Sequence, residues 1–395
     1  MSVKQVTLLG STGSIGESTL DVIRNSSDYS LHAISAYSNA ELLLKQCEEF
    51  NPTVAVLANE SLADAFAEQL AQAKCDTKLE VGSQALDEIA SADQVDIVMA
   101  AIVGAAGLAS SLAAVNSGKR LLLANKEALV MSGDLFMESA ASSGAQVIPI
   151  DSEHNAIFQC LPTSNNGING KQFEHVKKIV LTASGGPFLD LPLNDFTSVT
   201  PAQACKHPKW EMGRKISVDS ATMMNKGLEF IEAHHLFRLP PEQIEVLIHP
   251  QSIVHSFVHY RDGSVLAQMA NPDMRIPIAY GMAYPQRMDT TTKPLDLAEV
   301  GELHFRKPDL ERFPCLRLGM EAANQGGTAS AILNAANEIA VAAFLEEKLR
   351  FSEISLIIEE VMSKIPCEAA ASLAIIQDTD KRARNLSKEL ILKEF

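Results

Sequence analysis

Short apolar segments alternate with amphipathic ones along the first 150 residues, and this alternation limits the possible folds more than any other feature of the chain. Strands are predicted at residues 6–9, 31–36, 53–57, 96–101, 120–124 and 145–150. Helices are predicted between several of them, at residues 40–50, 62–73, 108–117 and 129–141. Strands that alternate with helices favour right-handed βαβ units on a parallel sheet. The pattern therefore predicts a doubly wound α/β domain at residues 1–150.

The first predicted strand is followed by glycines at a spacing that suits a nucleotide. In VTLLGSTGSIGESTLDVI, Gly10, Gly13 and Gly16 come directly after the strand and at the start of a helix. Glycines there let the backbone approach a pyrophosphate, and the helix amides favour its charge. The spacing G-x-x-G-x-x-G differs from the usual G-x-G-x-x-G, and a tight turn without a ligand is the alternative. Because the loop opens a series of βα units, nucleotide binding is the better interpretation.

The end of the second predicted strand, AISAYSNAE, bears on the choice of dinucleotide. An NAD site would place an acid there to bond the 2′-hydroxyl of the ribose, and no acid precedes Glu41. The sequence therefore favours NADP, although no Arg or Lys stands at the strand end. Ser38 and Asn39 are the candidates for bonding the 2′-phosphate, with Lys45 nearby.

The pattern changes after residue 150. A strand in KKIVLTASGGP precedes a Pro-rich loop and a helix predicted at residues 220–237. One long strand over IEVLIHPQSIVHSFVHY, the turn RDGS and the segment VLAQMA together predict an antiparallel hairpin. These features predict an α+β domain at 151–285, a linker at 286–312 and a carboxy-terminal helical domain at 313–395.

Two acidic residues stand at the end of the last strand of the first domain, in IPIDSEHNAIFQC. Asp151 and Glu153 share one face of an extended strand end, and their charges repel unless a cation or a proton lies between them. Oxygen ligands of this kind suit Mg²⁺ or Mn²⁺. The alternative is that Asp151 or Ser152 caps the next helix, with His154 in a structural role. The residues alone leave both interpretations open.

A third carboxylate lies on the helix predicted in SVDSATMMNKGLEFIEAHHLF, for which Asp219 and Ser220 are cap candidates. Asn225, Lys226 and Glu229 fall on one face of this helix, among methionines and a phenylalanine. Glu229 is therefore a candidate third ligand for a cation. The alternative is an ordinary pair of polar side chains on a wet surface.

Two further segments suit an anionic ligand. TASGGP ends a strand with Ser184 and two glycines, and KHPKWEMGRK is a basic loop that contains the only tryptophan, Trp210, of a chain with a formal net charge of −16. A basic and aromatic loop of this kind is typical of a lid over a bound anion. The alternative is a solvated loop that the tryptophan anchors to the core.

The remaining composition excludes several classes of protein. The acidic balance argues against a nucleic-acid or anionic-membrane partner. No apolar run approaches the roughly 20 residues of a membrane span. A strand pattern begins within the first residues, MSVKQVTLLG, and no targeting segment precedes it. A cytoplasmic protein is therefore expected. The 6 cysteines form no C-x-x-C pair and are expected to be reduced thiols.

Six segments of the chain, in their order and spacing, resemble the 1-deoxy-D-xylulose 5-phosphate reductoisomerase family. They are GSTGSIG, LLANKEALV, DSEHNAIFQ, TASGGPF, HPKWEMGRKISVDSATMMNKGLEFIEA and LIHPQS. The resemblance spans essentially the whole chain. It implies a Rossmann-type NADPH domain, an α+β domain for catalysis and dimerisation, and a carboxy-terminal α-helical bundle. It also implies a homodimer that requires NADPH and Mn²⁺ or Mg²⁺.

The resemblance assigns roles to individual residues. The implied metal ligands are Asp151, Glu153 and Glu229, which with Lys126 form the implied catalytic set. The implied substrate contacts are Lys126, Ser152, Glu153, Ser184, His207, Trp210, Met212, Ser220, Asn225, Lys226 and Glu229. The implied NADPH contacts are Thr12, Gly13, Ser14, Ile15, Ser38, Asn39, Asn125, Glu127 and Gly213. Ser38 departs from the family, which often has a basic residue there, and this bears on the tightness of NADPH binding.

The implied reaction converts 1-deoxy-D-xylulose 5-phosphate to 2-C-methyl-D-erythritol 4-phosphate in non-mevalonate isoprenoid biosynthesis. A retro-aldol and aldol rearrangement is followed by reduction with NADPH, and a cation held by three carboxylates suits the negative charge that develops on vicinal oxygens. The main alternative is a metal-independent NADP-dependent dehydrogenase of a phosphorylated or acidic carbonyl compound. A redox-sensing nucleotide-binding protein is the non-enzymatic alternative.

Overall fold

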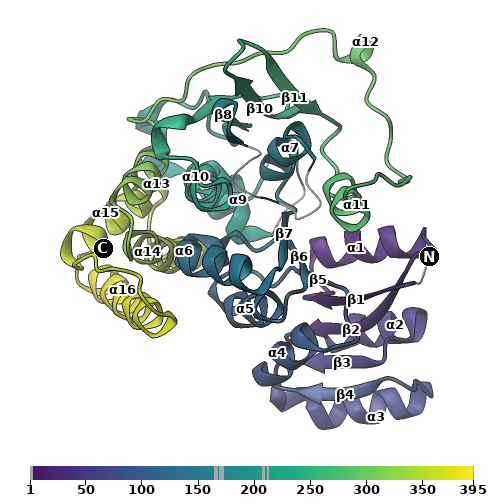
Figure 1. Ribbon diagram of the computed structural model, residues 1–395. Coiled ribbons are helices and arrows are strands. Elements are labelled where there is room, and N and C mark those ends of the chain that lie inside the picture. The colour runs from purple at the N-terminus through teal and green to yellow at the C-terminus, as the bar shows by residue number, and fades with distance from the viewer. Residues whose placement is uncertain (1–2, 164–167, 169–172, 207–209, 211–212, 395) are drawn as a thin grey trace.

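The amino-terminal part of the chain forms a seven-stranded parallel sheet in the computed structural model, which describes residues 3–163, 168, 173–206, 210 and 213–394 (Figure 1). Its strands are β1 (Lys4–Leu9), β2 (Tyr29–Ala36), β3 (Val54–Leu57), β4 (Lys78–Val81), β5 (Ile97–Ala100), β6 (Arg120–Leu123) and β7 (Gln146–Pro149). Their order in space is β4-β3-β2-β1-β5-β6-β7. The predicted doubly wound α/β fold is confirmed.

Helices cover both faces of this sheet: α1 (Ser14–Arg24), α2 (Ala40–Phe50), α3 (Ala63–Ala73), α4 (Ser83–Ser91), α5 (Leu108–Asn116) and α6 (Lys126–Ser143). Alternate residues of β1 therefore enter different cores, with Val6 and Leu8 in one and Leu9 in the other. The chain runs outward from β1 to β4 and returns to β5 on the other side of β1. Ligands of doubly wound sheets bind at the carboxyl ends of the strands at such a reversal.

Three predictions for this part of the chain were incomplete. Strand β4, an edge strand of sequence KLEV whose side chains are half-buried or exposed, was not predicted, because it lacks a strong apolar signal. Helix α4, which follows β4, was not predicted either. The helix predicted at 129–141 in fact begins at Lys126, where the side chain of Asn125 accepts a hydrogen bond from the amide of Ala128 and caps the first turn.

A second, mixed sheet follows, with strands β8 (Val176–Ala183), β9 (Ile244–Ile248), β10 (Val254–Tyr260) and β11 (Val265–Met269) in the order β11-β10-β8-β9. The predicted hairpin is confirmed, because β10 and β11 pair antiparallel across the predicted turn. The single long strand is wrong. The chain breaks near Ser252, which has a positive φ of 54°, so that β9 and β10 lie on opposite sides of β8.

The helix predicted at 220–237 is also wrong in its first part. The structure has two helices, α9 (Arg214–Ala221) and α10 (Met224–Phe237), separated by Met223 in the left-handed conformation with a φ of 61°. Asp219 and Ser220 lie in the last turn of α9 and cap nothing at the start of α10. The pattern of polar residues could not reveal this break, because neither Gly nor Pro marks it.

The remaining helices are α7 (Ser152–Cys160), α8 (Pro201–Ala204), α11 (Arg275–Ala283), α12 (Leu297–Val300), α13 (Pro314–Gln325), α14 (Ala329–Leu345), α15 (Ile354–Lys364) and α16 (Leu373–Glu394). Helix α7 packs on β10 and β11, and α14 lies beside α6 and carries the other carboxy-terminal helices around it (Figure 1). The predicted carboxy-terminal helical bundle is confirmed. Among the described residues, no helix combines the length and apolar character needed to cross a membrane. The 6 cysteines are free thiols, as predicted.

A pair of glycines brings α10 and α13 close together. A Cβ atom built on Gly319 of α13 would lie 2.5 Å from the Cα atom of Gly227 in α10. Real side chains do not approach a backbone atom so closely, so the two helices fit only while this position has no side chain. The carboxy-terminal bundle thereby fixes the position of α10, which carries Lys226 and Glu229.

We expect Gly319→Ala to destabilise the protein by about 1–3 kcal/mol, because the added methyl group must push two backbones apart. Thermal unfolding measures this change. Asn324→Ala, at an exposed position of the same helix, is the control and should leave the unfolding midpoint almost unchanged. Equal midpoints for the two variants would contradict the close contact of the helices.

Candidate functional site

Three carboxylates converge where β7 ends. Asp151 follows this strand and caps α7, because its Oδ1 atom accepts hydrogen bonds from the amides of Glu153 at 3.1 Å and His154 at 3.5 Å. Glu229 reaches the same place from α10. One carboxylate oxygen from each of Asp151, Glu153 and Glu229 lies within 4.8 Å of the others. The predicted helix cap is therefore confirmed, while the metal site stays a prediction: Asp151 Oδ1 caps α7 and Oδ2 faces Lys126.

Two buried lysines neutralise this cluster. The Nζ atom of Lys126 lies 2.8 Å from Asp151 Oδ2, 2.8 Å from Glu229 Oε1 and 2.9 Å from Asn225 Oδ1. Lys226 pairs with Glu229 and lies 3.7 Å from Glu153 Oε2. Both lysine side chains are almost completely buried. Buried charges are costly unless they are paired, so these contacts allow three carboxylates to share the interior.

The charges also set the protonation of the cluster. Burial alone would raise the pKa of Asp151, but Lys126 lowers this pKa well below its usual value. Burial likewise opposes ionisation of Glu153, and Lys226 lowers the pKa of that carboxyl. The pKa of Glu229 is raised, because its burial and the charge of Asp151 outweigh both lysines.

A loop of small residues follows the end of β8 and lies against the end of α9. The Ser184 hydroxyl accepts a hydrogen bond from the amide of Gly186 at 3.2 Å. Gly186 has a φ of +68°, and a Cβ atom there would lie 2.6 Å from the carbonyl oxygen of Ser220. Ser184 and Ser220, which are distant in the sequence, are thus brought to one place. Ser152, on the cluster side, donates to Glu153 Oε2 at 3.0 Å.

Between Lys206 and Gly213, Trp210 is the one described residue of the basic loop, so the predicted contacts His207 and Met212 lie outside the described residues. The ring of Trp210 lies 6.3 Å from that of His255, and His255 Nδ1 is 3.9 Å from Glu153 Oε1. Trp210 therefore lies at the edge of the carboxylate cluster. The sequence analysis missed His255, which lies within β10, and nothing in a strand pattern singles out such a histidine.

The glycine loop lies at the reversal point of the first sheet. Thr12 is half-buried, while Gly13 and Ser14 are exposed at the start of α1, with Ile15 behind them. A Cβ atom on Gly10 would lie 2.9 Å from the carbonyl oxygen of Ala101, which follows β5. The close approach of these two strand ends explains the glycine. The resulting turn leaves the first amides of α1 directed at the crevice where a pyrophosphate would bind.

The ends of the dinucleotide site differ in charge. Ser38 and Asn39 are exposed after β2, where Asn39 caps α2 by accepting from the amide of Leu42 at 3.2 Å. Lys45 instead pairs with Glu41 at 2.7 Å on an exposed face. The start of α2 therefore offers amides and the side chains of Ser38 and Asn39 to a phosphate, while Glu41 in its first turn is paired with Lys45.

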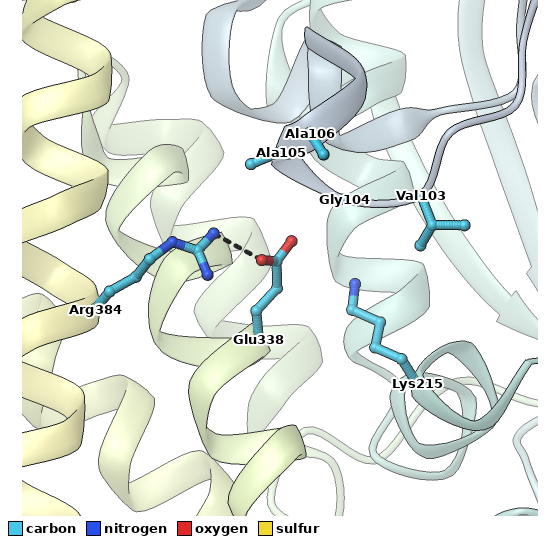
Figure 2. Close-up of a pocket in the computed structure, with 7 residues that line it drawn as sticks. All are labelled: Val103, Gly104, Ala105, Ala106, Lys215, Glu338 and Arg384. Atoms are coloured by element: carbon cyan, nitrogen blue, oxygen red, sulfur yellow. Dashed lines mark hydrogen bonds and ion pairs between the residues drawn. The ribbon is translucent and has the colours of Figure 1, made fainter. Parts of the chain in front are cut away.

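The other end has buried charges. The amide of Asn125 donates to the carbonyl oxygens of Ile102 and Gly104, which fixes the loop after β5. Glu127 pairs with Lys215 Nζ at 2.9 Å, and Gly213 lies exposed at the start of α9. A cavity of about 410 Å³ lies beside Lys215 and Gly104, and Figure 2 shows the residues that line it. It is lined by Val103, Gly104, Ala105, Ala106, Lys215, Glu338 and Arg384.

This cavity joins three parts of the chain. Glu338 of α14 pairs with Arg384 of α16 at 2.6 Å, and its other oxygen lies near the position of a Cβ atom on Gly104. Lys215 points into the same space from α9 (Figure 2). The carboxy-terminal bundle thus completes the wall of the cavity next to Asn125 and Glu127, a contribution that the sequence analysis did not foresee.

Comparison with known proteins accounts for nearly the whole chain. Residues 6–133 match the family model of 1-deoxy-D-xylulose 5-phosphate reductoisomerase, and residues 147–237 and 269–386 match models of carboxy-terminal domains of DXP reductoisomerase. The reductoisomerase of Pseudomonas aeruginosa (strain UCBPP-PA14) is 55% identical over 99% of this chain and 98% of its own length. That of Paraburkholderia xenovorans (strain LB400) is 54% identical over 99% of this chain and 96% of its own length.

Solved structures agree with these relatives. A crystal structure of DOX-P reductoisomerase with NADPH, fosmidomycin and magnesium is 45% identical, covers 99% of both chains and has a TM-score of 0.94. The enzyme from Zymomonas mobilis in complex with NADPH is 44% identical, covers 99% of this chain and 100% of its own, and has a TM-score of 0.91. The sequence, the fold and the carboxylate cluster agree: the chain belongs to the 1-deoxy-D-xylulose 5-phosphate reductoisomerase family.

Proposed function

We propose that this protein converts 1-deoxy-D-xylulose 5-phosphate to 2-C-methyl-D-erythritol 4-phosphate with NADPH and a divalent cation, as a step of non-mevalonate isoprenoid biosynthesis. The observation that carries the proposal is the convergence of Asp151, Glu153 and Glu229 around Lys126 at the end of β7. The names of the relatives support the reaction. A similar structure is a complex with NADPH and magnesium, which supports the cofactors.

Asp151, Glu153 and Glu229 would hold the cation. Their ligand atoms are all oxygen, which favours Mg²⁺ or Mn²⁺ over softer metals. When bound, such a cation stabilises negative charge that develops on the substrate oxygens. Lys126, whose ammonium group lies among these carboxylates, is suited to hold an oxygen of the substrate or to move a proton to it. Ser152 places a hydroxyl beside Glu153 for a further substrate contact.

The phosphate of the substrate would lie at the Ser184 loop. Its partners would be Ser184, Ser220, Asn225 and Lys226, with His207 from the basic loop. Trp210 and Met212 of the same loop would form a lid over the substrate and the cofactor. The backbone near Gly186 supports this assignment because it brings β8 against the end of α9. Phosphate bound away from the reacting carbons supplies binding energy that can be used to orient them.

NADPH would bind at the crevice of the first sheet, where it supplies the hydride. Thr12, Gly13, Ser14 and Ile15 would hold the pyrophosphate, and Asn125, Glu127 and Gly213 would surround the nicotinamide end. Ser38 and Asn39 would hold the 2′-phosphate together with the first amides of α2, since helix amides attract anions. The division at residues 1–150, 151–285, 286–312 and 313–395 would separate cofactor binding, catalysis, linker and supporting bundle.

A metal-independent dehydrogenase is the weaker proposal. That enzyme would need its acids only as helix caps, and a cap needs neither Glu153 nor Glu229. Three carboxylates and two lysines buried together are costly to maintain without a function that uses their charge.

Oxidation of NADPH after addition of 1-deoxy-D-xylulose 5-phosphate tests the proposal, and loss of NADPH absorbance measures it. We expect turnover to stop in a chelator and to return with Mn²⁺ or Mg²⁺. Asp151→Asn and Glu229→Gln should lower turnover by about a thousandfold or more, because each removes a charge that holds the cation.

The control for these variants is the affinity for NADPH, which fluorescence titration measures. It should stay near that of the wild type, since both residues lie outside the proposed NADPH contacts. Turnover that resists the chelator, or a fully active Asp151→Asn variant, would favour the metal-independent dehydrogenase.

Gly186→Ala tests the phosphate site. The methyl group would collide with the carbonyl of Ser220 and strain a positive φ, so we expect KM for the ketose phosphate to rise by about tenfold to a hundredfold. Gly144→Ala is the matched control, because Gly144 also has a positive φ of +76° but no atom within 4 Å of the added Cβ. Steady-state kinetics measure both variants, and similar KM values would contradict the assignment.

We further propose that the protein is a homodimer that pairs through β11. This strand is the edge of the second sheet, and Val265 and Leu266 are 46% and 48% exposed. An exposed apolar edge strand is a template for another strand, and a second copy related by two-fold symmetry presents the same edge. A cytoplasmic location remains a prediction.

Leu266→Glu should convert the dimer to a monomer, because two charges would face each other across the paired edges. Light scattering measures the mass in solution. Leu356→Glu, at a leucine of α15 that is 51% exposed, is the control and should leave the dimer intact. A monomeric wild type, or a dimer that survives Leu266→Glu, would contradict pairing through β11.

A further inference from the structure

Glu232 is a buried carboxylate that the proposed reaction does not use. It lies on α10 three residues after Glu229, and its side chain is fully buried. Neither of its oxygens has a hydrogen-bond partner among the described residues. A buried carboxylate without a hydrogen bond lowers the stability of the fold, so its presence indicates a function.

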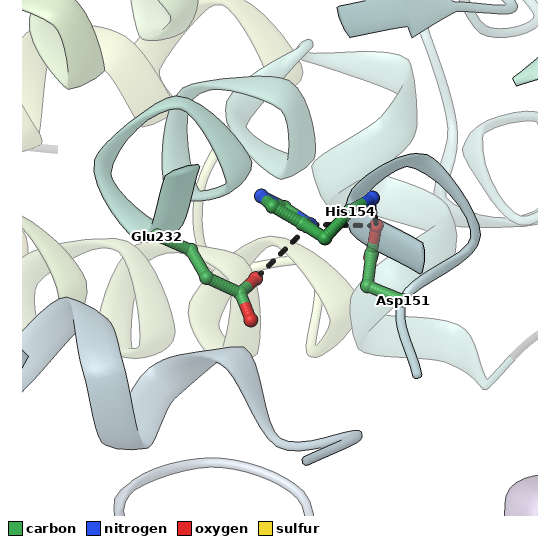
Figure 3. A group of neighbouring side chains, drawn as sticks. All are labelled: Asp151, His154 and Glu232. Atoms are coloured by element: carbon green, nitrogen blue, oxygen red, sulfur yellow. Dashed lines mark hydrogen bonds and ion pairs between the residues drawn. The ribbon is translucent and has the colours of Figure 1, made fainter. Parts of the chain in front are cut away.

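Its nearest charged neighbour is His154, which lies between Glu232 and Asp151 (Figure 3). His154 Nδ1 is 2.9 Å from Asp151 Oδ1 and 3.5 Å from Glu232 Oε2. Its other nitrogen, Nε2, is 2.9 Å from the backbone carbonyl oxygen of Glu229. Carboxylates and carbonyls only accept, so both ring nitrogens must carry a hydrogen and the ring is an imidazolium.

This cation is completely buried. Its side chain is 0% exposed, so water does not screen its charge. Asp151 is also engaged by Lys126, so Glu232 is the carboxylate available to balance the imidazolium.

We propose that Glu232 is a positioning residue that acts through His154 to orient Asp151 toward the divalent cation. His154 and the first amides of α7 hold Asp151 Oδ1, which leaves Oδ2 turned toward Lys126 and the cluster. Groups behind a metal ligand commonly fix its orientation in this way. The proposal rests on the metal site proposed above and adds a residue that lies outside it.

A second cation among Asp151, His154 and Glu232 is the competing explanation, since one ligand atom from each lies within 4.8 Å of the others. The hydrogen-bond geometry opposes it, because a ring nitrogen that donates to Asp151 cannot also bind a metal. The ring also stacks on Phe237, with centroids 6.0 Å apart, in the closed interior.

The test is Glu232→Gln, which keeps the shape of the side chain and removes its charge. Electron paramagnetic resonance of free Mn²⁺ gives the Kd and the stoichiometry without substrate or turnover. We expect the Kd for Mn²⁺ to rise by about tenfold or more, with one ion per chain and an unchanged Kd for NADPH. Glu232→Asp, which keeps the charge, should restore much of the affinity.

Phe237→Leu is the matched control for packing. It removes the ring stacked on His154 but no charge or hydrogen bond, so the unfolding midpoint should fall while the Kd for Mn²⁺ stays within about twofold. If Glu232→Gln does not fold, Glu232→Met replaces it as the test, because it also removes the charge and leaves no unpaired polar group in the interior.

Three results would overturn the proposal. The first is a Kd for Mn²⁺ within about twofold of the wild type in the folded variant that lacks the charge of Glu232. The second is an equal loss of affinity in Phe237→Leu, which would leave Glu232 with a packing role only. The third is two bound ions in the wild type and one in Glu232→Gln. Unchanged Mn²⁺ binding in Asp151→Asn would instead show that the proposed metal site itself is wrong.

Discussion

The structure depends on the mutual neutralisation of three buried carboxylates and two buried lysines. Asp151 and Glu153 come from the start of α7, Lys126 from the start of α6, and Lys226 and Glu229 from α10. Each charge would be unacceptable alone in a closed interior, so the three helices can approach only together. The same balance prepares the site for a cation and an anionic substrate, because the oxygens already face one point. Folding and function therefore both require that these charges are paired and that their oxygens converge.

Much of this arrangement could be predicted from the sequence, for a physical reason. The buried parallel strands and the glycine loop are local patterns, so the α/β fold and the cofactor crevice followed from periodicity and from Gly10, Gly13 and Gly16. The resemblance supplied the roles of single residues. Asp151 shows how two local interpretations can both hold, since one oxygen caps a helix while the other faces the cluster.

The remaining features could not be predicted because they depend on tertiary contacts. Met223 adopts a left-handed conformation that its residue type does not favour, and only the packing of α9 and α10 makes the break understandable. The strand break at Ser252 separates β9 from β10 in the same way. His255 and Glu232 look like ordinary strand and helix residues. They become meaningful only when distant elements bring Glu153 and His154 beside them.

The contact of Gly227 with Gly319 has a consequence for how the family can vary. Helix α13 of the carboxy-terminal bundle has no proposed catalytic residue, but its packing against α10 sets the position of Lys226 and Glu229. This packing requires that Gly319 has no side chain. Substitutions that reduce activity should therefore be found among small residues of α13 as well as among charged residues of the cluster. Such a substitution changes the geometry of the cluster through side-chain volume in α13 alone, while every residue of the site stays the same.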